Sequence, residues 1–104
     1  MPALVVLFNL KDKSAVKAYE KWAQNTDVPT VKKLKSVDDF KVYRLNAVMG
    51  AEGTPPPYEY CEILDINDMD QLGPDISTPA MQKVAAEFQE FADNPLFIVS
   101  EQFA

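Results

Sequence analysis

The first ten residues constrain the fold more than any other segment, because they form a run that is apolar on both of its faces. The run MPALVVLFNL is long enough for a strand and too short for a stable helix. In a strand, Leu4, Val6 and Phe8 point to one face. Val5 and Leu7 point to the other. A sheet built around this strand must therefore be covered on both sides.

The rest of the chain alternates between strand-like and helix-like periodicity. Val28-Pro29 is predicted to end the first helix and Gly73-Pro74 to break a short helical turn, because proline disfavours helical backbone before it and lacks an N–H. The predicted elements are strands over 1–10, 38–48, 58–66 and 96–103, helices capped by Ser14 (14–25) and opened by Thr78-Pro79 (78–92), one turn over 68–72, and a proline-rich loop over 49–57.

The element order βαββαβ favours an α+β, ferredoxin-like domain with a four-stranded antiparallel sheet and both helices on one face. A chain of 104 residues with 47% hydrophobic residues is typical of a single domain over 1–104. The last strand is also apolar on both faces, and no segment is left to cover the helix-free face. We therefore expect this face to pack on a second copy, giving a homodimer.

Composition excludes several classes of function. The chain has no histidine, which removes the commonest general base and most transition-metal sites, and a net charge of -6 disfavours nucleic acid. The acidic segment 65–70 lacks the turn glycine of a calcium loop, so helix capping explains it better. No apolar run is long enough to span a membrane, and the single Cys61 is typical of a reducing cytoplasm. We expect neither a metal nor a cofactor.

Strand 58–66 carries the first candidates for chemistry. Tyr58, Tyr60 and Glu62 share one face of this strand, so a carboxylate lies beside phenols. A buried glutamate with a raised pKa can shuttle a proton, which makes Glu62 and Tyr60 candidate catalytic residues, with Tyr43 as a third on the preceding strand. The alternative is that the tyrosines are core or interface residues whose hydroxyls bond to Glu62 or to backbone.

Aromatic residues from separate elements indicate a second feature. Phe8, Tyr19, Trp22 and Phe88 are predicted to converge between the sheet and the helices. A hollow lined by such residues suits a small flat ligand. Ordinary core packing explains the same residues equally well, so both interpretations stay open.

Several segments resemble known proteins. Val6–Lys11 and the sequence Phe91-Ala92-Asp93 resemble dimeric α+β barrel proteins of the stress-responsive and EthD-like type. A closer resemblance, nearly end to end, is to the RedY-like HapK family, and it is carried by Tyr19–Trp22, Val28–Val31, Asp65–Asp70 and Ala85–Gln89. This resemblance implies a dimeric α+β barrel that serves prodiginine (prodigiosin) red-pigment biosynthesis and assists the condensation of two pyrrole-containing intermediates.

The chain also departs from the wider superfamily. Catalytic relatives often carry histidines at the positions that match Leu4 and the Thr26-Asp27 pair here. Their imidazole chemistry is therefore not transferred, and Asp27 joins Tyr43, Tyr60 and Glu62 as a weaker substitute. Two functions remain open: a cofactor-free enzyme or accessory protein that binds pyrrole intermediates, and a non-catalytic binding or scaffold module that docks onto a condensing enzyme of the pathway.

Overall fold

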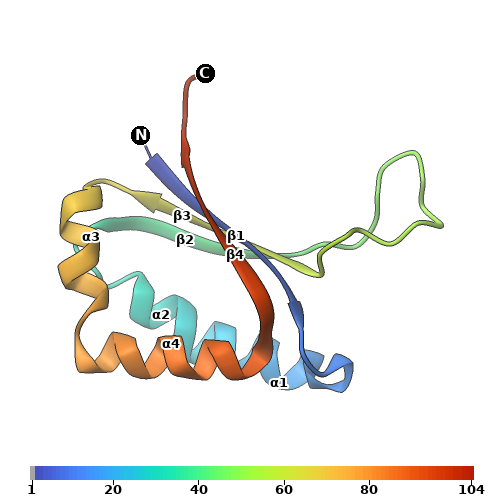
Figure 1. Cartoon of the computed structure of the whole chain (residues 1–104), viewed down its shortest axis with the longest axis horizontal. Helices are drawn as coiled ribbons and strands as arrows, with labels where there is room; N and C mark the ends of the chain where they lie inside the picture. The colour runs from blue at the N-terminus through green and yellow to red at the C-terminus, as the bar shows by residue number, and fades with distance from the viewer. Residues whose placement is uncertain (1) are drawn as a thin grey trace.

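A four-stranded sheet with helices along one face makes up the protein (Figure 1). The structure is a computed structural model and describes residues 2–104. Its elements are β1 (Pro2–Leu10), the 3-10 turn η1 (Lys13–Ala15), α1 (Val16–Trp22), the π-helical turn η2 (Ala23–Asp27), α2 (Val28–Val31), β2 (Val37–Arg44), β3 (Tyr60–Ile66), α3 (Met69–Ile76), α4 (Pro79–Phe91) and β4 (Ala92–Glu101).

The strands pair in the order β2-β3-β1-β4, and every pairing is antiparallel. The predicted ferredoxin-like arrangement is therefore confirmed. The register places Val6 of β1 beside Glu62 of β3 and Phe97 of β4. The apolar run that opens the chain is thus one of the two central strands of the sheet.

The two faces of the sheet have different surroundings. On the helix side, Val6 and Phe8 are buried in the core. On the other side, which no helix of residues 2–104 covers, Val5 and Leu7 are half-buried and Leu96 is exposed (Figure 1). The predicted two-sided apolar pattern of the first and last strands is confirmed, and it leaves an apolar face without a partner element within the chain.

The first helical region corrects two expectations. Asp12, not Ser14, caps it, because the Asp12 carboxylate accepts hydrogen bonds from the Ser14 N–H and hydroxyl. Pro29 does not end it, because the π-helical turn η2 intervenes and the Val28 N–H bonds to the Ala23 carbonyl, five residues back. Pro29 then lies in the first turn of α2, where a missing N–H costs little.

The Gly73-Pro74 pair was also wrongly predicted to break a helix. Asp68 caps α3 as expected, but the helix runs through Pro74 to Ile76. Burial of Leu72 on one side stabilises the helix in spite of the local proline signal. The Ser77 hydroxyl also donates a hydrogen bond to the Gly73 carbonyl at 2.7 Å. Tertiary packing has overridden the local preference here.

The end of α4 and the start of β4 are joined without a loop. Thr78 caps α4 and Pro79 opens it, as predicted. The strand begins at Ala92, earlier than the expected Leu96, because a bulge absorbs the segment in between. Asn94 has a φ of 44°, and the register with β1 shifts between Leu7 and Asn9. Proline is tolerated next to such a bulge in an edge strand, which explains Pro95.

Residues 45–59, between β2 and β3, project away from the sheet as an arm (Figure 1). The strands flanking it are therefore shorter than the predicted spans 38–48 and 58–66, and Tyr58 precedes its strand. Among residues 2–104, no helix is long and apolar enough to cross a bilayer.

Candidate functional site

A cavity of about 230 Å³, here called the inner cavity, lies between the helix side of the sheet and the helices. Apart from Asp27, Glu62 and Gln89, its walls are apolar. The apolar lining consists of Leu4, Val6, Val31, Leu34, Val37, Phe40, Leu64, Leu72, Ile76, Met81, Val84, Ala85, Phe88 and Phe97. Ile76 and Phe97 are 46% and 54% exposed, so this end of the cavity lies near the surface.

Glu62 reaches this cavity from the middle of β3. It lies two residues from Tyr60 and from Leu64 on the helix side of the sheet, and it is only 5% exposed. Its Oε2 atom accepts a long hydrogen bond of 3.4 Å from the Tyr19 hydroxyl. Burial and the nearby Asp27 charge raise the pKa of Glu62 to about 8, against a lowering by the Tyr19 hydrogen bond.

Asp27 reaches the same cavity from the end of η2. It is 5% exposed, and within the described part of the chain its carboxylate has no hydrogen-bond or ion-pair partner. Burial raises the pKa of Asp27 to about 7. A π-helical turn is often found at functional sites, and here it turns an acidic side chain toward an apolar cavity. Both carboxyl groups therefore titrate close to neutral pH, where acid and base work is most effective.

The predicted aromatic convergence is confirmed. The Phe8 ring centroid lies 5.5 Å from that of Tyr19 and 5.0 Å from that of Phe88, and Trp22 stacks on Phe88 at 6.5 Å. Phe8 is fully buried in this cluster. Phe88 lines the inner cavity, whereas Phe8 and Trp22 line none of the three cavities described for residues 2–104. The Trp22 ring N–H donates to Glu87 at 3.3 Å.

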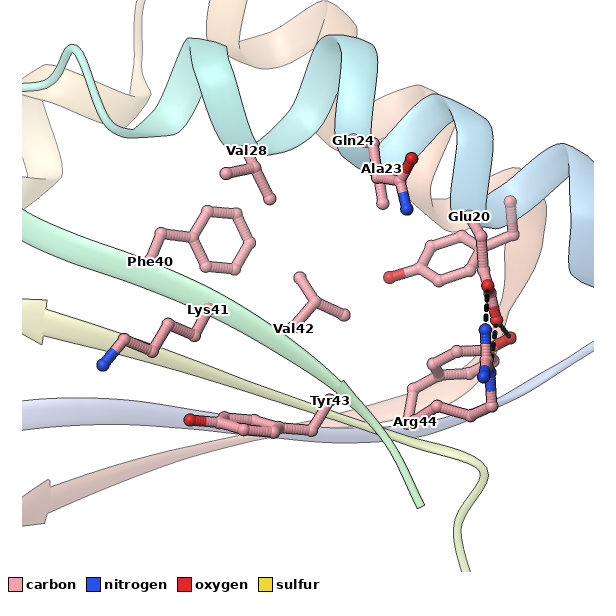
Figure 2. Close-up of a pocket in the computed structure, with 11 residues that line it drawn as sticks. Glu20, Ala23, Gln24, Val28, Phe40, Lys41, Val42, Tyr43 and Arg44 are labelled. Atoms are coloured by element: carbon pink, nitrogen blue, oxygen red, sulfur yellow. Dashed lines mark hydrogen bonds and ion pairs between the residues drawn. The ribbon is translucent and has the colours of Figure 1, made fainter. Parts of the chain in front are cut away.

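A larger and more open space of about 500 Å³, here called the outer cleft, lies between β2 and the helices α1 and η2 (Figure 2). At one end, Arg44 pairs with the Glu20 carboxylate through two hydrogen bonds, one of them 2.8 Å from Nε. The Tyr60 hydroxyl donates to the same carboxylate at 2.7 Å. The Arg44 hydrogen bond holds the pKa of Glu20 below its usual range, and burial raises the pKa of Tyr60 to about 12.

The structure brings together only part of the predicted site. Glu62, Asp27 and Phe88 meet at the inner cavity, and Tyr19 contacts Glu62 from the core. Tyr60 lies on the same face but bonds to Glu20, not to Glu62. Tyr43 points to the opposite side of β2 from Phe40 and Val42, as Figure 2 shows.

Sequence reasoning missed the cluster of Glu20, Arg44 and Tyr60. The sequence singles out neither Glu20 nor Arg44 as a site residue. The one local signal is that Glu20 follows Tyr19, so it lies next to the core-facing side of α1. The contact with Arg44 depends on how α1 crosses β2, which periodicity does not specify.

The fold and the acidic cavity define a ferredoxin-like protein with a ligand-sized hollow under its helices. Structural comparison agrees. The crystal structure of HapK from Hahella chejuensis superposes with a TM-score of 0.78 at 30% identity, covering 99% of this chain and 93% of that one. An EthD-family protein from Bacillus halodurans (17% identity, 99% of both chains, TM-score 0.73) shares the fold. A dimeric protein of unknown function from Bacteroides fragilis also shares the fold, with 13% identity, a TM-score of 0.67, and coverage of 97% of this chain and 95% of that one.

The family model of the REDY-like protein HapK matches residues 2–103. The chain therefore belongs to the REDY-like HapK family, as its sequence segments predicted. No curated protein matches the chain at a significant level.

Proposed function

We propose that the chain binds an aromatic pyrrole intermediate of prodiginine-type pigment biosynthesis in the inner cavity and assists its condensation, as an accessory protein or a cofactor-free enzyme. Membership of the HapK family supports the pathway. The observation that carries the site is an apolar cavity of about 230 Å³ with two buried carboxyl groups. Because apolar cavities of about 150 Å³ already accept benzene, the inner cavity has room for one or two small rings.

The carboxyl pair suits the chemistry of this condensation. A pyrrole aldehyde and a second pyrrole form a bond between the aldehyde carbon and a ring carbon, and water is released. The addition needs an acid at the aldehyde oxygen and a base for the ring proton. A pair that carries one proton supplies both, with Glu62, the group of higher pKa, as the acid and Asp27 as the base. Holding the reactants in contact supplies several further kcal/mol.

Fluorescence of Trp22, the only tryptophan, tests binding. Trp22 stacks on Phe88, a wall of the cavity, so a bipyrrole aldehyde bound there should shift or quench its emission saturably. Above about pH 8, where Glu62 is ionised, Glu62→Gln should weaken binding by about 1 to 2 kcal/mol, because a charge-assisted bond to a pyrrole N–H is lost. Glu20→Gln, in the outer cleft, is the matched control and should leave binding unchanged. Unchanged emission together with silent calorimetry would refute the site.

A turnover assay distinguishes an enzyme from a non-catalytic binding or scaffold module. An enzyme should accelerate condensation of the two precursors without the ATP-using condensing enzyme of the pathway, and Glu62→Gln should slow it. Saturable binding with no rate change would identify a non-catalytic binding or scaffold module that docks onto a biosynthetic enzyme.

We also propose that two copies pack through their helix-free faces. Val5 and Leu7 of β1 and Leu96 and Ile98 of β4 make this face apolar. Analytical ultracentrifugation should give about twice the chain mass of 11.7 kDa. Leu7→Asp should dissociate the dimer, because an unpaired carboxylate in a dry interface costs several kcal/mol. A chain that stays monomeric at high concentration would contradict the proposal.

A cytoplasmic location completes the proposal. The free thiol of Cys61 is half-buried and unpaired by any disulfide, which is typical of a reducing compartment. Fractionation of producing cells should recover the protein with cytoplasmic markers, and recovery in a secreted fraction would contradict this.

A further inference from the structure

The inner cavity contains two acidic side chains and no basic side chain among the described residues that line it. Asp27 and Glu62 are both about 95% buried, as their 5% exposures show, and no Lys or Arg side chain lines the cavity within residues 2–104. Glu20, which lines the outer cleft, has Arg44 as its counter-ion. Buried carboxylates are normally paired with a cation or bonded by several donors.

The pair also lacks hydrogen-bond donors. An ionised carboxylate only accepts hydrogen bonds, and two of them offer up to eight lone-pair sites. The single donor to this pair within the described residues is the Tyr19 hydroxyl, at 3.4 Å from Glu62. Asp27 has none, although it lines the cavity. The remaining lone pairs of the two carboxylates can therefore be satisfied only by donors that enter the cavity from outside the chain, either water or a ligand.

We infer that the inner cavity selects a flat, apolar organic cation that carries two N–H donors on one edge, with Asp27 and Glu62 as its acceptors. This inference rests on the proposed function and narrows its ligand class. A conjugated dipyrrole formed by condensation has a basic nitrogen next to an N–H, so its protonated form meets the description and the neutral precursors do not. The site would then hold the product more tightly than the reactants.

A metal ion fits the same pair poorly. Divalent cations such as Ca²⁺ take six to eight oxygen ligands and Mg²⁺ takes six. The cavity offers two carboxyl groups and the Gln89 amide among apolar walls, and residues 2–104 contain no group of three side chains placed to hold a metal. The apolar walls instead match the flat body of an aromatic cation.

Binding of a cation should release protons from the pair. At neutral pH the pair retains protons because burial raises the pKa of both Asp27 and Glu62. Tyr19 of α1 is the titratable group that faces the pair from a neighbouring element, and burial raises the pKa of its hydroxyl, so it stays a neutral donor. Helix α4 adds Gln89, and the cavity-lining side chains of β1, β2, α2, α3 and β4 are apolar. Affinity for a cation should therefore rise with pH.

Calorimetric titration with benzamidine and with benzamide tests the inference, since the two have nearly the same shape and only benzamidine is a cation with two parallel N–H donors. We expect benzamidine to bind at least about tenfold more tightly at pH 8. Its affinity should rise by up to about tenfold per pH unit between pH 6 and pH 8, while that of benzamide stays flat. The Asp27→Asn/Glu62→Gln double variant should lose the preference, and Glu20→Gln should keep it.

The other outcomes distinguish a failure of the inferred cation preference from a failure of the proposed function. Equal binding of both probes would overturn the cation preference and leave the cavity as a ligand site. No binding of either probe, with no Trp22 response to the bipyrrole aldehyde, would overturn the proposed function as well. A preference that survives in the double variant or disappears in Glu20→Gln would place the cation elsewhere and overturn the inference.

Discussion

Two glutamates in this protein, Glu20 and Glu62, each accept a hydrogen bond from a tyrosine hydroxyl, but their pKa values shift in opposite directions. Tyr19 and Glu20 are consecutive on α1, and Tyr60 and Glu62 are two residues apart on β3. The pairs cross over, because the Tyr19 hydroxyl donates to Glu62 and the Tyr60 hydroxyl donates to Glu20. Yet the pKa of Glu20 is lowered and that of Glu62 is raised.

The difference comes from surroundings and not from residue type. Glu20 lies at the edge of the outer cleft with the Arg44 guanidinium against it, so its charge is compensated within the chain. Glu62 lies under the helices, and the group beside it is a second acid, Asp27. The charge of Glu20 is balanced by Arg44 within the chain. The negative charge of the Asp27 and Glu62 pair can be neutralised only by protons or by a ligand.

The largest expected effect is on how the free energy of unfolding depends on pH. The folded-state pKa values of Asp27 and Glu62 lie above their ordinary values, so their favourable contribution is complete below about pH 4 and is lost as pH rises through about 7 to 8. Asp27→Asn/Glu62→Gln should therefore be more stable than the parent at pH 9, by a few kcal/mol, and this advantage should be much smaller at pH 5.

Urea unfolding at both pH values measures this difference. Equal effects of the double substitution at pH 5 and pH 9 would show that the two groups are not titrating in the cavity.

Arg44→Ala should lower the free energy of unfolding, and its effect should be smaller than that of the Asp27→Asn/Glu62→Gln double variant. The folded-state pKa of Glu20 is lowered, so its contribution is present above its ordinary pKa and is lost as pH falls through the folded value. Because the Arg44 side chain is 60% exposed, solvent screens the ion pair and the loss of stability at pH 7 should be small. Thermal unfolding at pH 7 and pH 3 provides the measurement. A loss of the same size at pH 3 would assign the effect to packing instead of charge.

The smallest effects come from a matched pair of tyrosine substitutions. Tyr60→Phe should raise the pKa of Glu20, and Tyr19→Phe should raise that of Glu62, because each hydroxyl stabilises the ionised form. Tyr60 should have the larger effect, since its hydrogen bond is 2.7 Å long and that of Tyr19 is 3.4 Å. Both shifts should be small and upward, and carboxyl-carbon NMR measures them. The reverse order would contradict the geometry.

Sequence periodicity was sufficient to predict the sheet, because residues two apart share a face whatever the rest of the chain does. The shared face of Tyr60 and Glu62 and the two-sided pattern of β1 followed from this rule alone. The rule of proline as a helix breaker failed at Pro29 and Pro74, where a π-helical turn and the burial of Leu72 changed the local balance.

The partners of the site residues were not predictable in the same way. Tyr60 shares a face with Glu62, but its hydroxyl reaches Glu20 on α1. Which acid each tyrosine contacts depends on where α1 crosses the sheet. That crossing is set by the fit of Phe8, Tyr19 and Phe88 against one another, and no local pattern encodes it.

Site-resolved titration of the carboxyl carbons by NMR tests the central claim most directly. It measures, in one sample, Asp27 and Glu62, which have no counter-ion, and Glu20, which has Arg44. We expect the Asp27 and Glu62 pair to titrate with midpoints of about 7 and about 8, and Glu20 to titrate below its ordinary value of 4.5. Midpoints near 4 for all three groups would contradict the account, because the inner cavity would then hold two ordinary carboxylates.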